Sequence, residues 1–190
     1  MKYSMELTAE QRDILQGKQG DTLAKVMETL VRYGEIFGAT SMVPITSSYN
    51  HLVTSFGLKA LGPVYDLMNR LIEADAISKQ QFSADPRPLD PKVPSSFSAK
   101  YSFLSTLCIQ SRIFMRISLK KLGLLDPDAF TCTCYMDEVG NTPKMGEVLS
   151  WSESSAVVYA NSVLGARCNR NSGIIDLMGS VVGYVLISVC

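Results

Sequence analysis

The amino-acid sequence predicts an α/β layered domain in which helices surround short, mainly parallel strands. The main evidence is alternation: segments with apolar residues every three or four positions are separated by short segments with a strand-like pattern. The composition agrees, because 46% of the 190 residues are hydrophobic and 19% are charged. This is enough apolar material for a sizeable core and argues against intrinsic disorder. The length fits one domain or slightly more.

The first helices are predicted from end signals as much as from periodicity. Thr8 is a suitable N-cap for a short helix that Gly17 would end. Asp21 would cap a longer helix over residues 22–37, whose apolar side chains form a rough stripe. Gly38 would end this second helix. The first third of the chain is therefore expected to be mostly helical.

Residues 41–74 predict a strand, a loop and a helix in that order. Residues 41–46 are short and apolar, and Pro44 places them at a sheet edge or a strand end. Residues 47–55 are polar and predict a loop. Residues 58–74 return to the helical period, with their apolar side chains on one side. A strand between two helical segments is what an α/β layer requires.

The second half begins with a segment that cannot be regular structure. Residues 85–94 hold four of the eight prolines, which predicts a linker or a rigid loop that crosses a site. Residues 101–122 are mixed apolar and basic and predict a helix, followed by a turn at 126–128. Residues 130–136 alternate and are rich in Thr and aromatic residues, so they predict a strand. Residues 150–164 open with a capping-box pattern and predict a helix.

Charge and cysteine content exclude several classes of protein. The formal net charge is zero, so no basic footprint for nucleic acid is visible. The polar N-terminus is neither a secretory signal nor a membrane anchor, and the apolar tail 173–190 is too interrupted for a membrane helix. Five cysteines without an export signal predict reduced thiols in the cytoplasm. The single histidine, His51, excludes H-E-x-x-H zinc chemistry.

Cys132 and Cys134 are the first candidate for chemistry. On a strand, their spacing would point both side chains to the same face. One interpretation is two small, half-buried residues. The other is a thiolate at a strand end that binds iron or an iron–sulfur cluster. A cluster needs at least three ligands, and the sequence supplies no second compact cysteine group.

Polar residues after an apolar helix form a second candidate. They are Asn161, Ser162, Arg167, Asn169 and Arg170. One interpretation is a helix–helix packing face built from small residues. The other is a polar lining for an anionic ligand, with Arg167 or Arg170 as a bidentate clamp on a carboxylate. The spacing leaves both open.

The polar segment 46–51 is a third candidate, because loops that follow a strand commonly bind ligands in open α/β sheets. Its hydroxyls and backbone N–H groups could bind a carboxylate or a phosphate, or it could be an ordinary surface loop. Neither nucleotide-binding glycine fingerprint is present. A Ser–His–Asp triad would have to use His51, and the sequence singles out no partners for it.

The segment 130–171 resembles the aconitase X family of hydro-lyases. The matching motifs are T-C-T, P-K-x-G-E and W-x-E-S-S-A-V-V-Y-A-N-S-V-L-G-A-R. The opening L-T-x-E-x-x-x-x-L-x-G, then R-Y-G-E-I-F-G-A and V-P-I-T-S, fit the family as well. The resemblance extends over nearly the whole chain and is weaker between residues 56 and 128. It implies a partial aconitase-like fold, with residues 1–190 as the N-terminal part of the catalytic, large-subunit domain.

The resemblance implies dehydration of a small hydroxy acid at an iron or iron–sulfur centre. Members of the family include phosphomevalonate dehydratase and cis-3-hydroxyproline dehydratase. In the family pattern, Cys132 stands where a cysteine ligates iron. The positions that would contact the substrate are Leu52, Val53, Thr54, Asp85, Pro86, Asn161 and Ser162. No catalytic residue is assigned within this chain.

The departures from the family pattern shape the expected function. Asp85 replaces a common Asn and would place a negative charge near an anionic substrate unless Arg87 or iron offsets it. Cys134 stands where many members have Pro. The family's large polypeptide is about twice as long, carries further cluster cysteines, and works with a small swivelling subunit or domain that supplies a catalytic serine. The chain therefore looks like a truncated member.

Two functions remain open at this point. One is a hydro-lyase, with this chain inactive on its own. The other is a non-catalytic remnant that acts as a small-anion-binding or interaction module. We expect five residues to converge on one cleft: Thr54, Asp85, Cys132, Asn161 and Ser162. We also expect the apolar tail 174–189 to be exposed, which would favour self-association or a partner chain, with no nucleic acid and no membrane involved.

Overall fold

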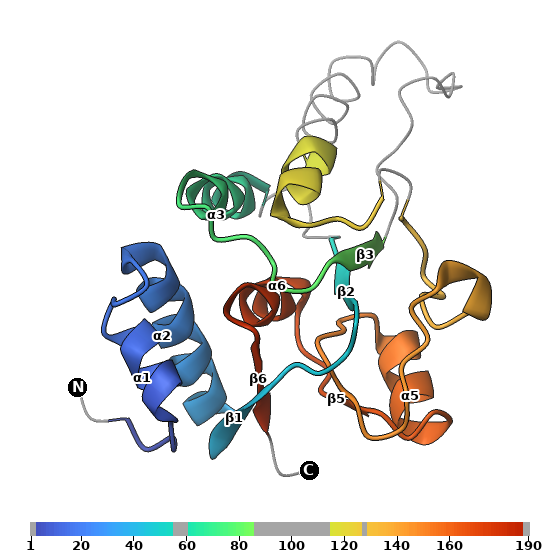
Figure 1. Ribbon diagram of the computed structural model, residues 1–190, viewed down its shortest axis with the longest axis horizontal. Coiled ribbons are helices and arrows are strands. Elements are labelled where there is room, and N and C mark those ends of the chain that lie inside the picture. The colour runs from blue at the N-terminus through green and yellow to red at the C-terminus, as the bar shows by residue number, and fades with distance from the viewer. Residues whose placement is uncertain (1–2, 55–60, 86–114, 127–128, 188–190) are drawn as a thin grey trace, which may run out of the picture.

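The computed structural model describes residues 3–54, 61–85, 115–126 and 129–187 (Figure 1). The chain begins with α1 (Ala9–Leu15) and α2 (Asp21–Ile36), as predicted. Thr8 caps α1 by a reciprocal capping box, in which its hydroxyl accepts from Gln11 N–H and the Gln11 side chain accepts from Thr8 N–H. The buried residues of α2 include Val26, Leu30 and Gly34, which recur at helical spacing and form its core face.

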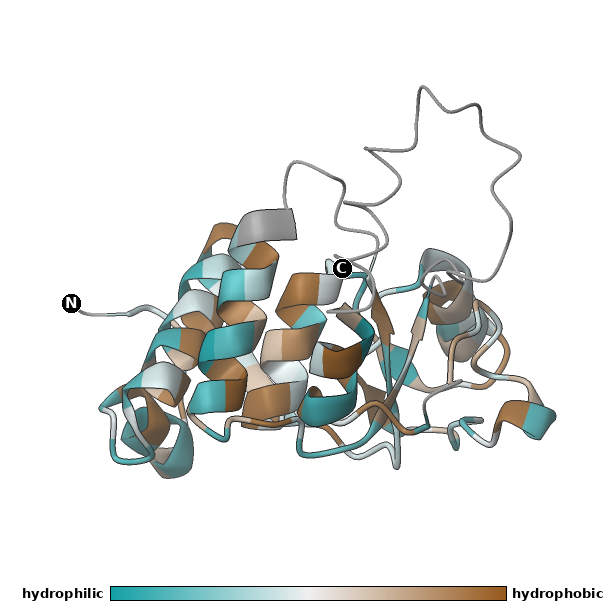
Figure 2. Cartoon of the chain, turned by 90° about the horizontal axis from the view of Figure 1, so that it is seen from above, coloured by the Kyte–Doolittle hydropathy of each residue, from teal (hydrophilic) through white to brown (hydrophobic). Residues whose placement is uncertain are grey.

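A buried helix, α6 (Gly173–Val182), lies at the centre of the molecule (Figure 1). It packs against α2 on one side and against β2 (Asn50–Val53) and β6 (Tyr184–Ile187) on the others. β6 pairs antiparallel with β1 (Ser41–Pro44). The surrounding helices carry apolar and polar residues side by side (Figure 2), whereas nearly all of α6 is buried. The core of the domain is therefore built around α6.

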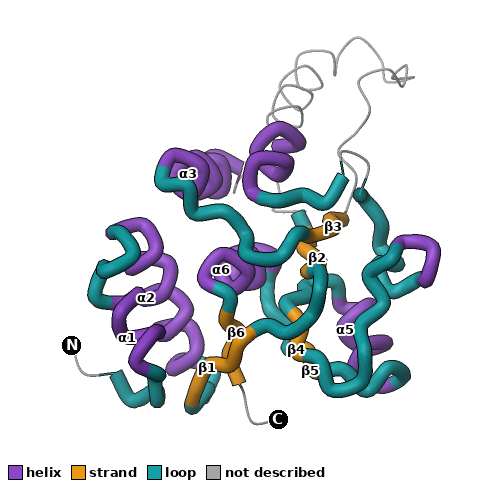
Figure 3. The backbone as a smooth tube through the Cα atoms, viewed as in Figure 1, coloured by secondary structure: helices purple, strands orange, loops and turns teal. Residues whose placement is uncertain are grey.

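The remaining strands are short and parallel. β2 pairs with β3 (Phe82–Asp85), and β4 (Val148–Leu149) pairs with β5 (Arg167–Cys168). Single parallel bridges extend this arrangement: His51 meets Trp151, and Ala84 meets Phe130. Two of the three strand pairs in the described part are thus parallel (Figure 3), which confirms the predicted layered α/β class.

Helices from three separate parts of the sequence lie beside the short strands. α3 (Leu61–Glu73) and a helical segment at 115–122 lie beside each other near β3 (Figure 1). α5 (Ser154–Ser162) packs on β5. Its buried face joins a second, smaller core with Trp151 and Cys134. None of the helices in the described ranges combines the length and the apolar character that crossing a membrane requires.

The predictions for residues 47–55 and 130–136 were wrong. The predicted loop 47–55 contains β2, because Asn50 and His51 are buried in a hydrogen-bonded strand. The predicted strand 130–136 is a single bridge at Phe130 followed by turns and a 3₁₀ helix, η3 (Asp137–Val139). Here the Thr131 hydroxyl accepts from Thr133 N–H, a local bond that competes with strand pairing.

The predicted capping box at residues 150–153 does not form. α5 begins at Ser154 with Glu153 as its N-cap, and Glu153 makes no side-chain capping bond. The preceding residues are extended instead: Ser150 O accepts from His51 N–H, and Ser152 N–H donates to His51 O. Strand pairing with β2 therefore takes the residues that the sequence pattern assigned to the helix start.

The expectation that the tail 174–189 exposes apolar surface was wrong over its described part. Most side chains from Ile175 to Leu186 are buried, because this segment forms the central helix and its paired strand. Several other predictions fall outside the described residues. These are the proline-rich loop beyond Asp85, with Pro86 and Arg87, most of the helix 101–122, and residues 127–128 of the turn.

Candidate functional site

The carboxyl ends of the parallel strands β2 and β3 lie side by side. Thr54, the residue after β2, donates its backbone N–H to Asp85 O at 2.6 Å, and its hydroxyl lies 3.2 Å from the same oxygen. Val53 N–H donates to Ser152 Oγ at 2.7 Å. In open parallel sheets, ligands bind outside this edge. Thr54, Asp85 and the start of α5 therefore form the candidate site.

Two carboxyl groups set the electrostatics of this edge. Burial raises the pKa of Asp85 above its ordinary value, and the nearby negative charge of Glu153 raises it further. Asp85 therefore holds its proton to a higher pH than a solvated aspartate. A protonated carboxyl carries one donor and one acceptor, as a side-chain amide does. In its protonated form, Asp85 can make the kind of contacts that an asparagine makes.

The two cysteines of the T-C-T-C segment lie in different environments. Thr131 N–H donates to Ala84 O at 2.9 Å, which places Cys132 immediately beyond β3 with its side chain exposed. Cys134 is fully buried in the second core, and burial strongly raises the pKa of its thiol. Because no strand forms here, the expected common face does not exist. Of these two thiols, that of Cys132 is the accessible one.

Asn161 and Ser162 lie at the other end of α5. The Asn161 amide donates to Cys168 O at 2.8 Å and to Val157 O at 3.0 Å, and its oxygen accepts from Cys168 N–H at 3.1 Å. This side chain thus connects α5 to β5. Ser162 is exposed. Asn161 also lines a groove of about 400 Å³ with Arg167, Asn169 and apolar residues of β1 and β6.

The structure brings together only some of the predicted site residues by direct bonds. Thr54 bonds to Asp85, and Cys132 follows a residue that bonds to β3. Within the described residues, no hydrogen bond joins Asn161 or Ser162 to these three. Arg170 is exposed, and Leu52 is buried in β2, so that a ligand would meet Leu52 through its backbone. Convergence of all five residues on one cleft stays a prediction.

A buried polar network beneath the site was not foreseen. His51 Nδ1 lies 2.9 Å from Ser83 Oγ, and Asn141 donates to Asn50 O at 3.2 Å. Asn50 donates to Ser180 Oγ at 2.9 Å, which ties β2 to α6. Burial lowers the pKa of His51 to about 4, so His51 is neutral at pH 7. The polar residues at positions 47–51 were the sequence signal for this network, but polar residues are also typical of a loop.

Ser152 and Glu153 were also not predicted as site residues from the sequence. Both belong to the W-S-E-S segment, where the serine–glutamate spacing drew attention to helix capping. In the structure Ser152 accepts from Val53 N–H, and Glu153 acts on the pKa of Asp85. The signal that could have found them is the position of a carboxylate at the start of a helix that follows an extended segment.

The donors at this edge fit a metal centre only in part. Cys132 supplies one accessible thiol, with the carboxyl of Asp85 in the same region. In the residues described, however, no group of three or more His, Cys, Asp or Glu side chains is arranged to hold a metal ion. Iron–sulfur clusters need at least three protein ligands. The described residues do not make a complete iron site by themselves.

The fold and the strand-end site define an aconitase-like α/β domain. Its backbone superposes on the crystal structure of Thermococcus kodakaraensis aconitase X in its holo form with a TM-score of 0.71 and 31% sequence identity. The match covers 96% of this chain and 42% of that one. The family model described as "Aconitase X first domain" matches residues 4–187. The chain therefore belongs to the aconitase X family.

Curated relatives carry dehydratase names. The phosphomevalonate dehydratase large subunit of Methanocaldococcus jannaschii is 33% identical over 179 residues, and that of Thermococcus kodakarensis is 35% identical over 184. Each match covers 94% of this chain, but only 42% and 41% of the relatives. Cis-3-hydroxy-L-proline dehydratase of Hypocrea jecorina is 27% identical over 183 residues and is covered to 28%. The chain spans well under half the length of these relatives.

Proposed function

We propose that this chain supplies part of the substrate wall of a hydro-lyase that removes water from a small hydroxy acid. The observation that carries the proposal is the contact of Thr54 with Asp85 where the parallel strands β2 and β3 end, with Cys132 just after a residue that bonds to β3, in a chain whose residues 4–187 match the aconitase X family. The dehydratase names of its relatives support the reaction class. The substrate class is a small acid that carries a hydroxyl group.

Such a dehydration needs a proton to leave a carbon next to a carboxylate and a hydroxyl group to depart. In its protonated form, which the raised pKa favours, Asp85 would donate a hydrogen bond to an oxygen of the acid and avoid charge repulsion with it. Thr54 fixes Asp85 through its two contacts to the Asp85 carbonyl. We assign the rest of the wall to Leu52, Val53, Pro86, Asn161 and Ser162.

The proposed iron centre would polarise the departing hydroxyl when bound. Cys132 is proposed as one of its ligands, because its thiol is exposed immediately beyond β3. The other ligands would come from outside the described residues, since these contain no three-residue metal group. A small swivelling subunit is the proposed partner, which is consistent with the "large subunit" names of the relatives. The reduced thiols fit a cytoplasmic setting.

A non-catalytic, anion-binding module is the second candidate. The observation in its favour is the groove in which Arg167 lies beside Asn161 and Asn169. A guanidinium beside side-chain amides suits a carboxylate. In this case the chain would bind a small acid at the groove without turning it over.

The deciding experiment measures both binding and turnover. The chain is prepared anaerobically with iron, alone and together with the remaining large-subunit part and the small subunit of an aconitase X enzyme, and supplied with phosphomevalonate or cis-3-hydroxy-L-proline. We expect no water loss with the chain alone and turnover only in the complete assembly. Acid binding that Arg167→Met abolishes, with no turnover in any assembly, supports the second candidate. No binding and no turnover contradicts both.

Variants at Asp85 connect the proposal to this site. Asp85→Asn retains the donor and acceptor and should keep substrate affinity, whereas Asp85→Leu should lose at least about tenfold, because one charge-assisted or neutral hydrogen bond is removed. The affinity of the unmodified chain should fall as pH rises and Asp85 ionises, and Asp85→Asn should remove this fall. Asp66→Asn, on the exposed side of α3, is the matched control. Equal pH profiles for all variants would exclude Asp85 from the substrate wall.

A further inference from the structure

The groove that Asn161 lines runs between two strand pairs, β1 with β6 and β4 with β5 (Figure 3). Its apolar side chains come from three of these strands: Val43, Val148, Val185 and Ile187. Val43 and Val185 are paired residues, and Ile187 follows two positions later, so these three side chains point to the same face of the β1/β6 pair. One face of this strand pair therefore forms a wall of the groove.

The two faces of the β1/β6 pair are covered to different degrees. On the first face, Met42 and Leu186 pack in the main core, where β6 contacts α2 and α6. On the face toward the groove, Val43 is only half-buried and Ile187 is 38% exposed. Burial of apolar surface is favourable by about 25 cal/mol per Å². This face would therefore gain free energy if further protein covered it.

Hydrogen bonds already occupy backbone groups along the groove. The Asn161 amide bonds to both the N–H and the C=O of Cys168 in β5, and the Asn169 amide donates to Leu186 O in β6. A partner that added a strand here would compete with these bonds. The groove is therefore suited to the apolar side chains of a helix or loop, not to an added strand.

Arg167 determines the charge that suits a partner. Its side chain is exposed, and its guanidinium has no hydrogen-bond or ion-pair partner among the residues that the structure describes. None of the described residues that line the groove is acidic. An apolar segment that carries one carboxylate would match both the apolar wall and this guanidinium.

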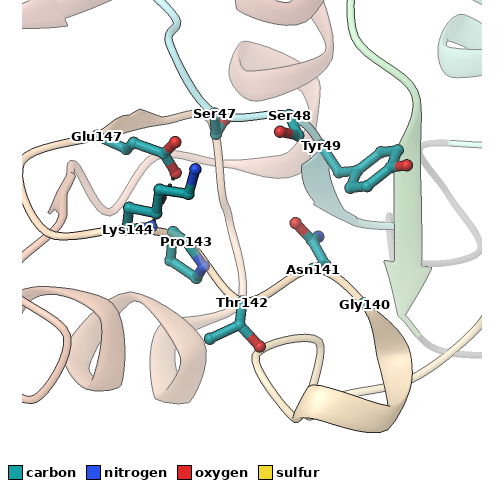
Figure 4. Close-up of a pocket in the computed structure, with 9 residues that line it drawn as sticks. All are labelled: Ser47, Ser48, Tyr49, Gly140, Asn141, Thr142, Pro143, Lys144 and Glu147. Atoms are coloured by element: carbon teal, nitrogen blue, oxygen red, sulfur yellow. Dashed lines mark hydrogen bonds between the residues drawn. The ribbon is translucent and has the colours of Figure 1, made fainter.

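A neighbouring pocket, formed by residues 47–49 and 140–147, has a different lining (Figure 4). Most of its residues are polar, and the side chains of Lys144 and Glu147 lie beside each other in it. An apolar surface placed there would remove both charges from water, which is costly. Of these two concavities, the groove is the one that suits a protein partner.

The comparisons indicate which protein would cover the groove. The match to the model described as "Aconitase X first domain" ends at residue 187, and Ile187 lines the groove. The chain covers only 42% of the Thermococcus kodakaraensis aconitase X chain. In a longer member of the family, the polypeptide beyond the first domain would start at the rim of the groove. Such a short connection gives it a high effective concentration there.

We propose that this groove is the docking surface for the second part of an aconitase X large subunit. That part inserts apolar side chains between β6 and β5 and places a carboxylate against Arg167. The proposal goes beyond the reaction, because it concerns association alone and holds equally for an inactive assembly. A groove filled in this way has no space for a small acid, so docking also argues against the second candidate function.

The test is co-expression of the full chain with the part of the Thermococcus kodakarensis phosphomevalonate dehydratase large subunit that lies outside the matched region, followed by affinity capture of the chain. We expect the two polypeptides to be recovered together. Ile187→Asp and Arg167→Glu should each lower the amount of captured partner by at least about tenfold, because each places an unpaired or like charge in the interface. Both positions are exposed, so both variants should keep the melting temperature of the unmodified chain.

Two control variants carry the same substitutions outside the groove. Ile77→Asp changes an exposed isoleucine between α3 and β3, and Lys144→Glu reverses a charge in the neighbouring pocket. Both should capture the partner as the unmodified chain does. The proposal is overturned if the unmodified chain captures no partner, or if the groove variants capture as much as the controls. The assay needs neither iron nor substrate, so its failure is distinguishable from a failure of the proposed reaction.

Discussion

The hydroxyl of Ser150 lies 3.0 Å from both the backbone carbonyl and the carboxylate Oδ1 of Asp176. This contact joins the residue beside β4 to the first turn of the central helix α6. Asn171 donates to the same carboxylate oxygen, while Oδ2 has no hydrogen-bond partner among the residues that the structure describes. Asp176 is fully buried, and burial raises its pKa to about 7. The contact thus places a titrating group in the middle of the core.

Asp176 should make the folded state less stable as pH rises. Its pKa is about 7 in the folded chain and near the ordinary value of 3.8 when unfolded, so the folded state binds more protons between these values. The free energy of unfolding therefore decreases as the pH rises from about 4 to about 7. Asp176→Asn should remove it, as urea unfolding at several pH values would show. An unchanged pH dependence in this variant would contradict the assignment.

His51 should act in the opposite direction. Burial lowers its pKa to about 4 from 6.5, so the unfolded state binds more protons over this range, and stability rises with pH. In the unmodified chain the two effects oppose each other. The free energy of unfolding of Asp176→Asn should therefore rise between about pH 4 and 6.5, and that of His51→Gln should fall. Parallel curves for the two variants would show that these residues do not dominate the pH dependence.

Alkylation of the folded chain should distinguish Cys132 from Cys134. Cys132 is exposed and Cys134 is fully buried with a raised thiol pKa, and the thiolate is the reactive form. Iodoacetamide should modify Cys132 in the folded chain and leave Cys134 unmodified, as peptide mass spectrometry would show. In denaturant both should react. Equal labelling in the folded chain would contradict the buried position of Cys134.

Asn161 should contribute to stability as well as lining the groove. Its side chain makes three hydrogen bonds, two of which connect α5 to Cys168 of β5. Asn161→Ala should destabilise the fold by about 1–2 kcal/mol, because bonds at a partly exposed position contribute modestly. Ser162→Ala, at the exposed neighbour, should change the melting temperature little. If both variants have the melting temperature of the unmodified chain, the hydrogen bonds between α5 and β5 contribute no measurable stability.

A methyl group at Gly179 should strain the centre of the fold. An added Cβ would lie 2.9 Å from the backbone oxygen of Tyr184, which cannot move without shifting β6. Overpacking of this kind costs about 1–3 kcal/mol. It outweighs the gain of up to about 1 kcal/mol from replacing glycine in a helix. Gly179→Ala should lower the melting temperature, whereas Thr29→Ala, on the exposed side of α2, should not.

Local signals explain what could be predicted of the fold. Thr8 and the one-sided apolar stripe of α2 carry their own information, since a cap and a helical period depend on nearby residues. The parallel strands were harder. Asn50 and His51 look like loop residues because their burial depends on partners such as Ser180 and Ser83, which are distant in the sequence. Tertiary hydrogen bonds override the polar pattern there.

Likewise, only part of the candidate site could be predicted from the sequence. The resemblance named Thr54, Asp85 and Cys132, and the structure shows a direct contact between Thr54 and Asp85 where β2 and β3 end, whereas Cys132 follows a residue that bonds to β3. The pKa effect of Glu153 on Asp85 could not be read from the sequence, because the two residues come together only through sheet formation. The buried position of the tail was also missed. An apolar run reads as exposed or as core only once its neighbours are known.

The pairing of β1 with β6 also governs how the polypeptide reaches its native state. Ser41 pairs with Ile187, so β1 finds its neighbouring strand only after residues 42–187 have been synthesised. Until then, the inner faces of α1 and α2 have no central helix to cover them. Contacts between such distant residues slow folding, because the entropy of closing a long loop must be lost before the strand pairing contributes stabilising free energy. During synthesis on the ribosome, the apolar side of the N-terminal helices would stay exposed, and chaperones could bind there.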